Sequence, residues 1–432
     1  MENLGHRVAI VGAGYAGMAA AVTLAAAGVR VVVFEAGPIP GGRARRVHPH
    51  GRDLDNGQHI LIGAYTELLG LMRLVGVPSD AVLRVPLELR YADGFALRAL
   101  WLPAPLGLLG GLLSLRKVSI GERLGAIRFM QSLKRMKFRL EQDIPVDGLL
   151  ESHGQAGRIG DYLWRPLCVS ALNTPPAQAS AQVFINVPRD SLASYADASD
   201  LLLPRIDLSQ LFPERAAQFV QARGGEVRTG EAVRGIEAGL RIGAESFSAI
   251  VLAVAPFQLE PFASLVGALP GYTYQPIFTC YLQYPQRVRF PFPMLGLKSG
   301  LVQWIFDRDA LGGKRGLVSC MISAEGEHQR MTHADLAAAC HREVAQALGA
   351  LPEPEWSQVI AEKRATFTCV PGIVRPAQET ATPGLFLAGD YTDPDYPPVL
   401  EAAVRSGVRA ARKVLALLNA PAVRDVIPRR SS

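Results

Sequence analysis

The clearest chemical signal in the chain is a group of glycines near its N-terminus. Gly12, Gly14 and Gly17 have the spacing Gly-x-Gly-x-x-Gly, and Glu35 follows eighteen residues after the third. In such a loop the first glycine makes a tight turn, the second lets the backbone approach a pyrophosphate, and the third permits close packing of a helix on a strand. A carboxylate at the position of Glu35 accepts hydrogen bonds from ribose hydroxyls and repels a 2′-phosphate. The pattern predicts a dinucleotide site and disfavours NADP as its ligand.

The elements expected around this loop position these groups. An apolar strand over residues 7–11 precedes the glycines, a small-residue helix over 18–27 follows them, and a strand over 29–34 leads to the acid. The N-terminus of such a helix offers free N–H groups and a partial positive charge to phosphate. We therefore expect this βαβ unit to bind the dinucleotide, with Ala16 in the loop and Ala36 beyond the second strand also in contact.

A second glycine-rich segment, GGRA at residues 41–44, follows soon after. Paired glycines let the chain pass close to a long ligand, and the Arg43 guanidinium can neutralise a pyrophosphate. Together with LDNGQH at residues 54–59, this segment is similar to the amine oxidase and carotenoid desaturase superfamily of flavoproteins. The resemblance implies that the cofactor is FAD. It implies further that FAD contacts Gly42 and Arg43, and that its isoalloxazine ring lies beside the turn at Gly57, Gln58 and His59.

Two later segments extend the resemblance. Residues 384–388 predict a buried strand that ends at Gly389 and Asp390, and residues 401–418 predict a long helix. The resemblance implies that Asp390 hydrogen-bonds the ribitol or pyrophosphate, and that the helix N-terminus, with Val399 and Leu400, faces flavin O2. Residues 224–233 predict a hairpin-like segment, in which the backbone of Val233 is implied to meet the adenine.

These separated motifs predict an α/β fold, with a discontinuous Rossmann-like FAD-binding domain of the amine-oxidase type and an inserted α+β substrate domain. A chain of 432 residues is long enough for both. We expect the FAD-binding domain over 1–90, 205–260 and 365–420, the substrate domain over 90–205 and 260–365, and a tail over 421–432.

The net charge of +6 is concentrated in one segment. Residues 116–139 hold eight basic residues against one acid, a net of +7, which leaves −1 for the rest of the chain. Apolar residues recur there at steps of three or four and predict an amphipathic helix, whereas residues 101–115 carry no charge. The segment 101–140 therefore fits contact with an anionic membrane surface, and a domain helix with a solvated basic face is the alternative. Nucleic acid is disfavoured, because few aromatic residues interleave the basic ones.

The remaining composition restricts location and metal chemistry. Five cysteines are scattered without a CxxC pair, which argues against a disulfide framework and against a zinc or iron–sulfur site. We expect no signal peptide and no spanning helix, because no apolar run reaches the required length of about 18–20 residues. The expected location is the cytoplasm, peripheral at the inner face of the cell membrane.

Over the full length the resemblance becomes narrower. Four segments carry it: DNGQHILIGAY at 55–65, LPAPLGLLGGLL at 102–113, WRPLCVSALNTPP at 164–176, and the C-terminal AGDYTD with EAAVRSG. Together they resemble the hydroxysqualene dehydroxylase family, the squalene-associated, FAD-dependent branch of the superfamily, from Arg7 to about Leu418. The resemblance implies reduction of hydroxysqualene to squalene in squalene and hopanoid biosynthesis, with electrons from an unidentified donor. The chain departs from the family at Tyr391, usually Trp, and at Val399, where a hydroxyl is lost.

The reaction needs a proton donor, because hydroxide is a poor leaving group. The candidates are His59, which we prefer, and three residues of the loop after the Gly-Asp turn, Tyr391, Asp393 and Tyr396. A phytoene-type carotenoid desaturase or an amine oxidase is the alternative enzyme, although the apolar middle of the chain disfavours amines. A flavin-free isoprenoid-binding protein is the alternative of another class, and the intact FAD motifs argue against it.

Overall fold

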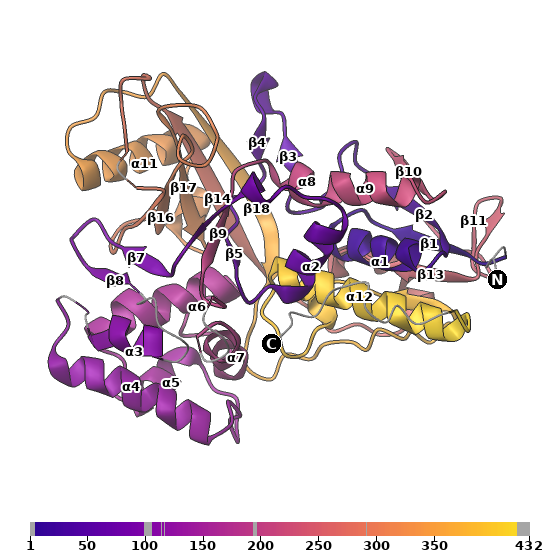
Figure 1. Ribbon diagram of the computed structural model, residues 1–432, viewed down its shortest axis with the longest axis horizontal. Helices are drawn as coiled ribbons and strands as arrows, with labels where there is room; N and C mark the ends of the chain where they lie inside the picture. Colours follow the sequence, from indigo (N-terminus) through magenta and orange to yellow (C-terminus); the bar gives the residue numbers. More distant parts are fainter. Residues whose placement is uncertain are drawn as a thin grey trace.

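The computed structural model describes residues 5–98, 106–113, 115, 117–192, 197–290 and 292–420, and two five-stranded sheets form its frame (Figure 1). One sheet is parallel, with the strand order β10-β2-β1-β13-β19, and the other has the order β15-β16-β17-β14-β18. The predicted tail and part of the predicted membrane-facing segment, residues 101–105, 114 and 116, lie outside the described residues. The domain boundaries given above stay a prediction.

The parallel sheet collects strands that are far apart in the sequence. They are β1 (Arg7–Val11), β2 (Arg30–Glu35), β10 (Glu226–Thr229), β13 (Ala249–Leu252) and β19 (Leu385–Leu387). Strand β10 pairs in parallel with β2, so the expectation of a hairpin-like segment there was wrong. Parallel strands are normally covered on both faces, which explains why β1, β2 and β13 are almost continuous apolar runs.

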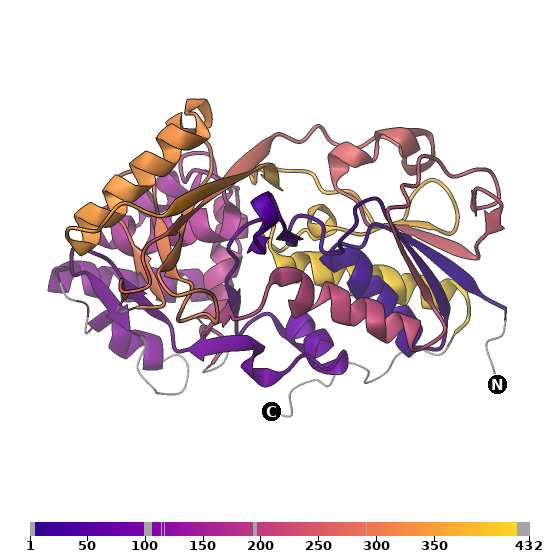
Figure 2. The same cartoon turned by 90° about the horizontal axis from the view of Figure 1, so that it is seen from above.

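Three helices cover one face of this sheet: α1 (Tyr15–Ala26), α9 (Pro213–Gln221) and α12 (Leu400–Leu417) (Figure 1, Figure 2). Small residues allow unusually close contacts among them. A Cβ at Gly17 would lie 1.9 Å from the Gly12 carbonyl oxygen, and one at Gly407 would lie 2.1 Å from the Ala16 carbonyl oxygen. The third glycine of the loop therefore has the packing role that its spacing predicts.

The second sheet is antiparallel and forms one wall of the site. Its strands are β14 (Tyr274–Gln283), β15 (Met294–Gly296), β16 (Trp304–Asp307), β17 (Leu317–Ser323) and β18 (Trp356–Phe367). Helix α11 (His333–Leu348) covers one face, into which Phe278, Cys280 and Leu282 point. Because side chains alternate along a strand, the intervening residues face the opposite way.

A helical region lies below this sheet in Figure 1 and completes the molecule. It contains α3 (Leu106–Leu113), α4 (Ile120–Arg135), α5 (Val146–Ser152), a π-helical turn at Gly160–Trp164, α6 (Arg165–Leu172) and α7 (Ala181–Ser191). Ser119 and Glu122 form a capping box at the start of α4. This helix ends at Arg135, and Lys137 and Phe138 beyond it have positive φ angles, so the predicted helix is real but shorter.

Shorter elements connect these layers. The short α-helices are α2 (Thr66–Leu74), α8 (Leu208–Leu211) and α10 (Ala263–Val266), and the 3₁₀ turns are η1 (Pro49–Gly51), η2 (Ser79–Ala81), η4 (Pro256–Gln258), η5 (Glu260–Phe262), η6 (Glu327–Arg330) and η7 (Asp390–Thr392). Three two-stranded sheets pair β3 (Arg46–Val47) with β4 (Leu54–Asp55), β7 (Glu88–Arg90) with β8 (Ala96–Arg98), and β11 (Arg241–Ile242) with β12 (Glu245–Ser246). A three-stranded sheet contains β5 (Leu61–Ile62), β9 (Leu201–Pro204) and β6 (Val82–Val85). Within the described ranges, no helix has both the length and the apolar character needed to cross a membrane.

Candidate active site

A cavity of about 1040 Å³ lies where the two sheets and the helical region meet. Its wall contains the glycine-rich loops, the inner face of the antiparallel sheet, and parts of α6, α7 and the N-terminus of α12. Pockets for a single drug-sized ligand are commonly about 300–1,000 Å³. This cavity therefore has room for a large cofactor together with part of a second ligand.

The two glycine-rich segments meet at one end of the cavity. Gly14 and Gly41 form an isolated parallel bridge, and a Cβ at Gly42 would lie 3.2 Å from the Gly14 Cα. Gly14 is also the N-cap of α1 and provides no side-chain cap, so the first N–H groups of that helix are left for a ligand. Gly12, Gly14, Ala16 and Gly42 line the cavity as predicted residues, whereas Gly17 packs behind them.

The acid at the end of β2 holds the loop as well as facing the cavity. The Glu35 carboxylate accepts hydrogen bonds from the Ala13 N–H at 2.8 Å and from the Gly37 N–H at 2.7 Å. Each oxygen keeps a second lone pair, so the carboxylate can still accept bonds from ribose hydroxyls. Ala36 and Val233 lie on the same wall, which brings all three predicted contacts to one end of the site.

Arg43 and Asp390, predicted as separate ligand contacts, form an ion pair. Nη2 of Arg43 lies 2.8 Å from Oδ1 of Asp390, and Nη1 donates to the Ala365 carbonyl oxygen at 2.7 Å. Asp390 is 4% exposed, so the pair fixes a buried carboxylate beside the cavity. The sequence separation of 347 residues explains why no local pattern indicates this contact.

The turn at residues 56–59 faces the cavity with its polar groups already arranged. Gln58 Oε1 accepts hydrogen bonds from Arg308 Nη1 at 2.7 Å and from Ser319 Oγ at 3.4 Å. His59 Nδ1 lies 2.9 Å from the Gly57 carbonyl oxygen, which can only accept, so Nδ1 carries the proton. Burial lowers the pKa of His59, the Gly57 bond opposes this, and the Arg43 charge lowers it further. The imidazole is therefore neutral near pH 7, with Nε2 as an acceptor.

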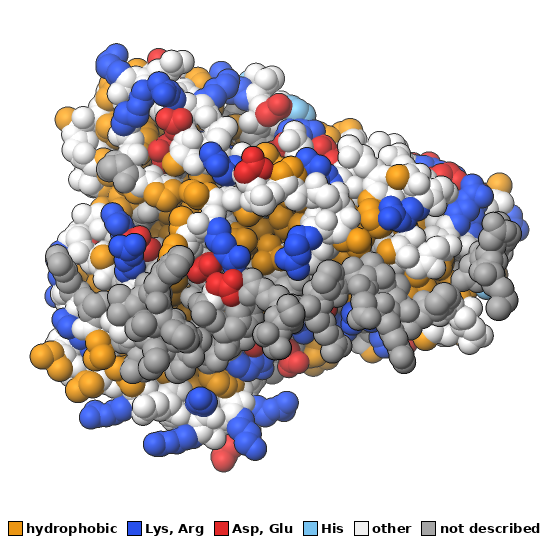
Figure 3. All heavy atoms as spheres, in the orientation of Figure 1, with side chains coloured by type: hydrophobic (Ala, Val, Ile, Leu, Met, Phe, Trp, Pro, Cys, Tyr) orange, Lys and Arg blue, Asp and Glu red, His pale blue; other side chains and the backbone are white. Residues whose placement is uncertain are grey.

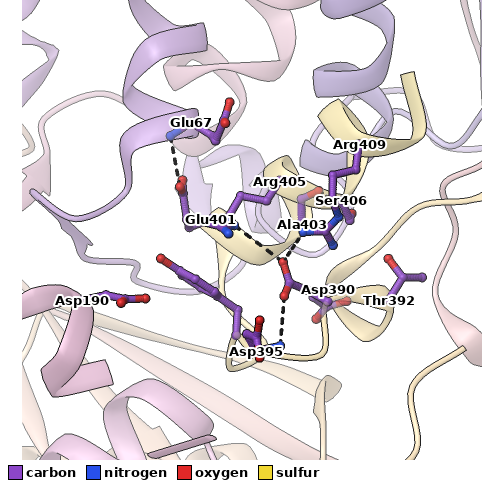
Figure 4. Close-up of polar contacts among 12 residues, drawn as sticks. Glu67, Asp190, Asp390, Thr392, Asp395, Glu401, Ala403, Arg405, Ser406 and Arg409 are labelled. Atoms are coloured by element: carbon purple, nitrogen blue, oxygen red, sulfur yellow. Dashed lines mark hydrogen bonds and ion pairs between the residues drawn. The ribbon is translucent and has the colours of Figure 1, made fainter. Parts of the chain in front are cut away.

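The other three proton-donor candidates have different surroundings, and Figure 4 shows Arg405 and Arg409, the partners of one of them, on α12. Asp393 is 1% exposed and is paired with Arg409 Nη1 at 2.8 Å and with Arg405 Nε at 3.7 Å. Tyr391 is fully buried, and neither it nor Asp393 lies on the cavity wall. Tyr396 is on the wall, and burial raises its pKa well above the ordinary value, with the Asp190 charge acting in the same direction. Of the four candidates, the structure therefore places His59 and Tyr396 against the cavity.

One residue that the sequence reasoning missed fixes the loop after Asp390. The Arg375 guanidinium donates through Nη1 to the carbonyl oxygens of Asp390 at 3.3 Å, of Tyr396 at 2.8 Å, and of Asp393. Its guanidinium also lies over the Phe367 ring, 4.8 Å from the centroid. An isolated arginine between apolar residues, as in Val374-Arg375-Pro376, gives no sequence signal for such a role.

The N-terminus of α12 lies at the same end of the cavity as the glycine-rich loops. Val399 is its N-cap without a side-chain cap, and both Val399 and Leu400 line the cavity, as expected for residues facing a cofactor. The Gly389 N–H donates to Ser406 Oγ at 2.8 Å, which ties the Gly-Asp turn to the helix. The free N–H groups of α12 therefore face the cavity from a fixed position.

The opposite end of the cavity is apolar. Trp304 and Phe306 on β16, Met294 on β15 and Met321 on β17 form one wall, and leucines of β7 and α6 lie among the other lining residues. The Trp304 Nε1–H donates to Ser170 Oγ at 3.3 Å. The alternation of Trp304, Ile305 and Phe306 indicates a strand face, but the sequence does not show which face meets the cavity.

The fold and the site define a dinucleotide-binding flavoprotein of the amine-oxidase architecture, with a parallel FAD-binding sheet and a separate sheet over an apolar chamber. The chain belongs to the flavin-containing amine oxidoreductase family, whose model matches residues 15–415. The residues present fit FAD: the bridged glycine loops give a cradle without side chains, and the N-termini of α1 and α12 supply uncapped N–H groups. The predicted cofactor, FAD, is confirmed at the level of this family.

The chain is similar over nearly its whole length to named relatives. It is 31% identical to a hydroxysqualene dehydroxylase of Rhodopseudomonas palustris, over 95% of this chain and 98% of the relative. It is 24% identical to a probable zeta-carotene desaturase of Synechococcus elongatus, over 95% and 98% of the two chains. Cyclohexylamine oxidase from Brevibacterium oxydans has a similar structure, with a TM-score of 0.67 at 18% identity, covering 96% of this chain and 99% of that one. The last likeness concerns the fold alone.

Proposed function

We propose that this protein is an FAD-dependent oxidoreductase that reduces hydroxysqualene to squalene. The observation that carries the proposal is a single cavity with dinucleotide-binding elements at one end and an apolar chamber at the other. Similarity to hydroxysqualene dehydroxylase of R. palustris supports the substrate, and the lower identity to a carotenoid desaturase makes desaturation the alternative.

The reaction replaces a carbon–oxygen bond by a carbon–hydrogen bond. When bound, reduced FAD supplies the hydride that the substrate carbon receives. The hydroxyl leaves as water after accepting one proton, and the electrons come from a donor outside this chain. As the bond to oxygen breaks, positive charge develops on an allylic carbon, and the faces of Trp304 and Phe306 can stabilise it. The surrounding apolar wall excludes water that would otherwise react with this carbon.

Two residues on the cavity wall can deliver the proton, and they predict different pH profiles. His59 must first become protonated, and its pKa lies below the ordinary value of 6.5. With His59 as donor, the rate falls about tenfold for each pH unit above that pKa. Tyr396 is protonated throughout the range from about pH 5 to 9, because its pKa lies above 10, so it predicts a flat profile. We propose that Asp393 and Tyr391 support the 390–396 loop.

The pH dependence is measured on prereduced enzyme, as flavin reoxidation in a single turnover with hydroxysqualene. If the rate declines with pH and His59→Ala abolishes this decline, the donor is His59. If the rate does not depend on pH and falls at every pH in Tyr396→Phe, the donor is Tyr396. Tyr391→Phe is the control, because that hydroxyl is buried off the cavity wall and has no partner among the described residues. Wild-type rates in both test variants would exclude both residues.

The function itself is tested with purified protein, hydroxysqualene and a chemical reductant under exclusion of oxygen. We expect squalene as the product, in an amount equal to the flavin oxidised. Formation of a conjugated polyene from phytoene by the oxidised enzyme, without squalene from hydroxysqualene, would instead assign desaturation. A colourless protein that does not take up FAD would refute an enzyme of either kind.

We propose that the tip formed by α3 and α4 contacts an anionic membrane on the cytoplasmic side. Leu113, Ile120 and Leu124 are among the few large apolar side chains that are exposed, at 46%, 71% and 40%. The predicted apolar stripe of α4 is divided, because Ile120 and Leu124 at its start are exposed whereas Leu133 near its end is buried. Figure 3 shows basic side chains along the lower edge of the molecule, where α4 lies, with apolar ones beside them. Exposed apolar groups next to lysines and arginines favour an anionic lipid surface.

A further inference from the structure

Thr366 is a polar residue of the cavity wall whose hydroxyl is only partly used by protein partners. It lies on β18 with 7% exposure and is one of the residues that line the cavity. Its Oγ1 accepts a hydrogen bond from Asn173 Nδ2 at 3.0 Å. Within the described part of the chain, its hydroxyl hydrogen donates to no protein group. A buried hydroxyl therefore keeps one hydrogen free beside an apolar space.

The orientation of Asn173 determines the direction of this hydrogen. Asn173 ends α6 in the left-handed region, with φ at 46°, and is 4% exposed. Its Nδ2 also donates to the Pro276 carbonyl oxygen at 3.2 Å, and its Oδ1 accepts from the Ala324 N–H at 2.7 Å. Because backbone groups fix both ends of the amide, Nδ2 must face Thr366. The threonine oxygen is thus an acceptor toward Asn173, and its hydrogen must point elsewhere.

Thr366 lies between the charged and the apolar ends of the cavity. The preceding residue, Ala365, accepts the hydrogen bond from Arg43, which is paired with Asp390. Ile277 and Met321, both on the antiparallel sheet, line the apolar part. Ser170 is another hydroxyl on the wall that accepts a hydrogen bond, from Trp304. Unlike Thr366, it has no chain neighbour that is hydrogen-bonded to the Arg43–Asp390 pair. A donor at this junction can meet an oxygen attached to a reacting carbon.

We propose that the Thr366 hydroxyl, held as a donor by Asn173, binds the hydroxyl oxygen of an isoprenoid alcohol and selects it over the corresponding hydrocarbon. The inference rests on the proposed function and adds the group that recognises the substrate oxygen. An aliphatic alcohol is too weak an acid to protonate the leaving group, so Thr366 orients the oxygen while another residue supplies the proton. Asn173 is a positioning residue that acts through Thr366.

The test compares two ligands that differ by one hydroxyl, using the change in flavin absorbance to measure binding to the oxidised holoenzyme. We expect Thr366→Val to weaken hydroxysqualene binding about tenfold and to leave squalene binding within about twofold. Thr366→Ser restores the preference, because it restores the donor. Asn173→Asp, which cannot donate to the threonine, reproduces the loss for hydroxysqualene alone. Thr368→Val is the matched control, since its buried Oγ1 has no partner among the described residues and lies off the cavity wall.

The outcomes separate this inference from the proposed function. If Thr366→Val weakens the binding of both ligands equally, or of neither, the role of Thr366 is overturned. This holds even if the wild-type enzyme converts hydroxysqualene. Wild-type enzyme that does not convert hydroxysqualene at all overturns the function and, with it, this assignment. Equal losses in Thr366→Val and Thr368→Val would show a general effect of the substitution and would also overturn it.

Discussion

Replacement of Glu401 by glutamine should change how the stability of this protein depends on pH. Glu401 is the second residue of α12 and has no exposed surface. Its carboxylate accepts hydrogen bonds from the Glu67 and Leu68 N–H groups at the start of α2, both at 3.0 Å (Figure 4). Burial raises the pKa of Glu401 from 4.5 to about 7, although these two bonds act in the opposite direction. The helix whose N-terminus lines the cavity therefore begins with a buried acid that is half protonated near neutral pH.

The size of the effect follows from that pKa. A rise from 4.5 to about 7 corresponds to roughly 3 kcal/mol between the two protonation states. The folded protein holds this proton more tightly than the unfolded chain. Its stabilising contribution is therefore complete below about pH 4.5, declines as the pH rises, and is lost above about pH 7. Glutamine is neutral at every pH, so the Glu401→Gln variant lacks this decline. Its loss of one acceptor oxygen adds a constant that does not depend on pH.

Urea unfolding of the holoenzyme, followed by tryptophan fluorescence between pH 5 and 8, measures the prediction. The difference in free energy of unfolding between wild type and Glu401→Gln should shift by about 2–3 kcal/mol in favour of the variant as the pH rises. Glu67→Gln is the control, because it removes a carboxylate at the same helix junction whose side chain is 25% exposed. A difference that stays constant within about 0.5 kcal/mol across the range would show that Glu401 does not carry the pH dependence.

Three further predictions concern the cofactor, the packing of α12 and the membrane. Arg43→Met leaves Asp390 buried without its partner, so FAD affinity in equilibrium dialysis should fall at least tenfold, and unchanged affinity would contradict the role of the pair. Gly407→Ala places a Cβ 2.1 Å from a carbonyl oxygen of α1 and should lower the melting temperature by several degrees, more than the same change at exposed Gly235. Ile120→Glu with Leu124→Glu should abolish flotation with anionic liposomes at low salt, and retained flotation would leave α4 as a solvated helix.

The sequence predicts the local elements at the glycine-rich end of the cavity, because short-range spacing determines their geometry. A turn, a helix N-terminus and an acid at a strand end all lie within the 24 residues from Gly12 to Glu35, and each has a backbone reason for its position. The contacts that join distant segments are a different matter. Neither the pairing of Arg43 with Asp390 nor the anchoring of the 390–396 loop by Arg375 has a local signature. Strand β10 was assigned to the wrong pairing for the same reason, since a short strand between glycines does not specify its neighbour.

Asp393 shows where sequence position is insufficient for a chemical role. An acid close behind the Gly-Asp turn suggests a catalytic group, but its side chain faces α12, where Arg405 and Arg409 are spaced by one helical turn. The two ion pairs hold this carboxylate against the helix, and it does not lie on the cavity wall. The junction between the charged and the apolar ends of the cavity has the opposite character, since Asn173 fixes the neutral hydroxyl of Thr366 there. The Arg43–Asp390 ion pair therefore fixes the glycine-rich end of the cavity. In our proposal, the oriented hydroxyl of Thr366 distinguishes an alcohol from a hydrocarbon.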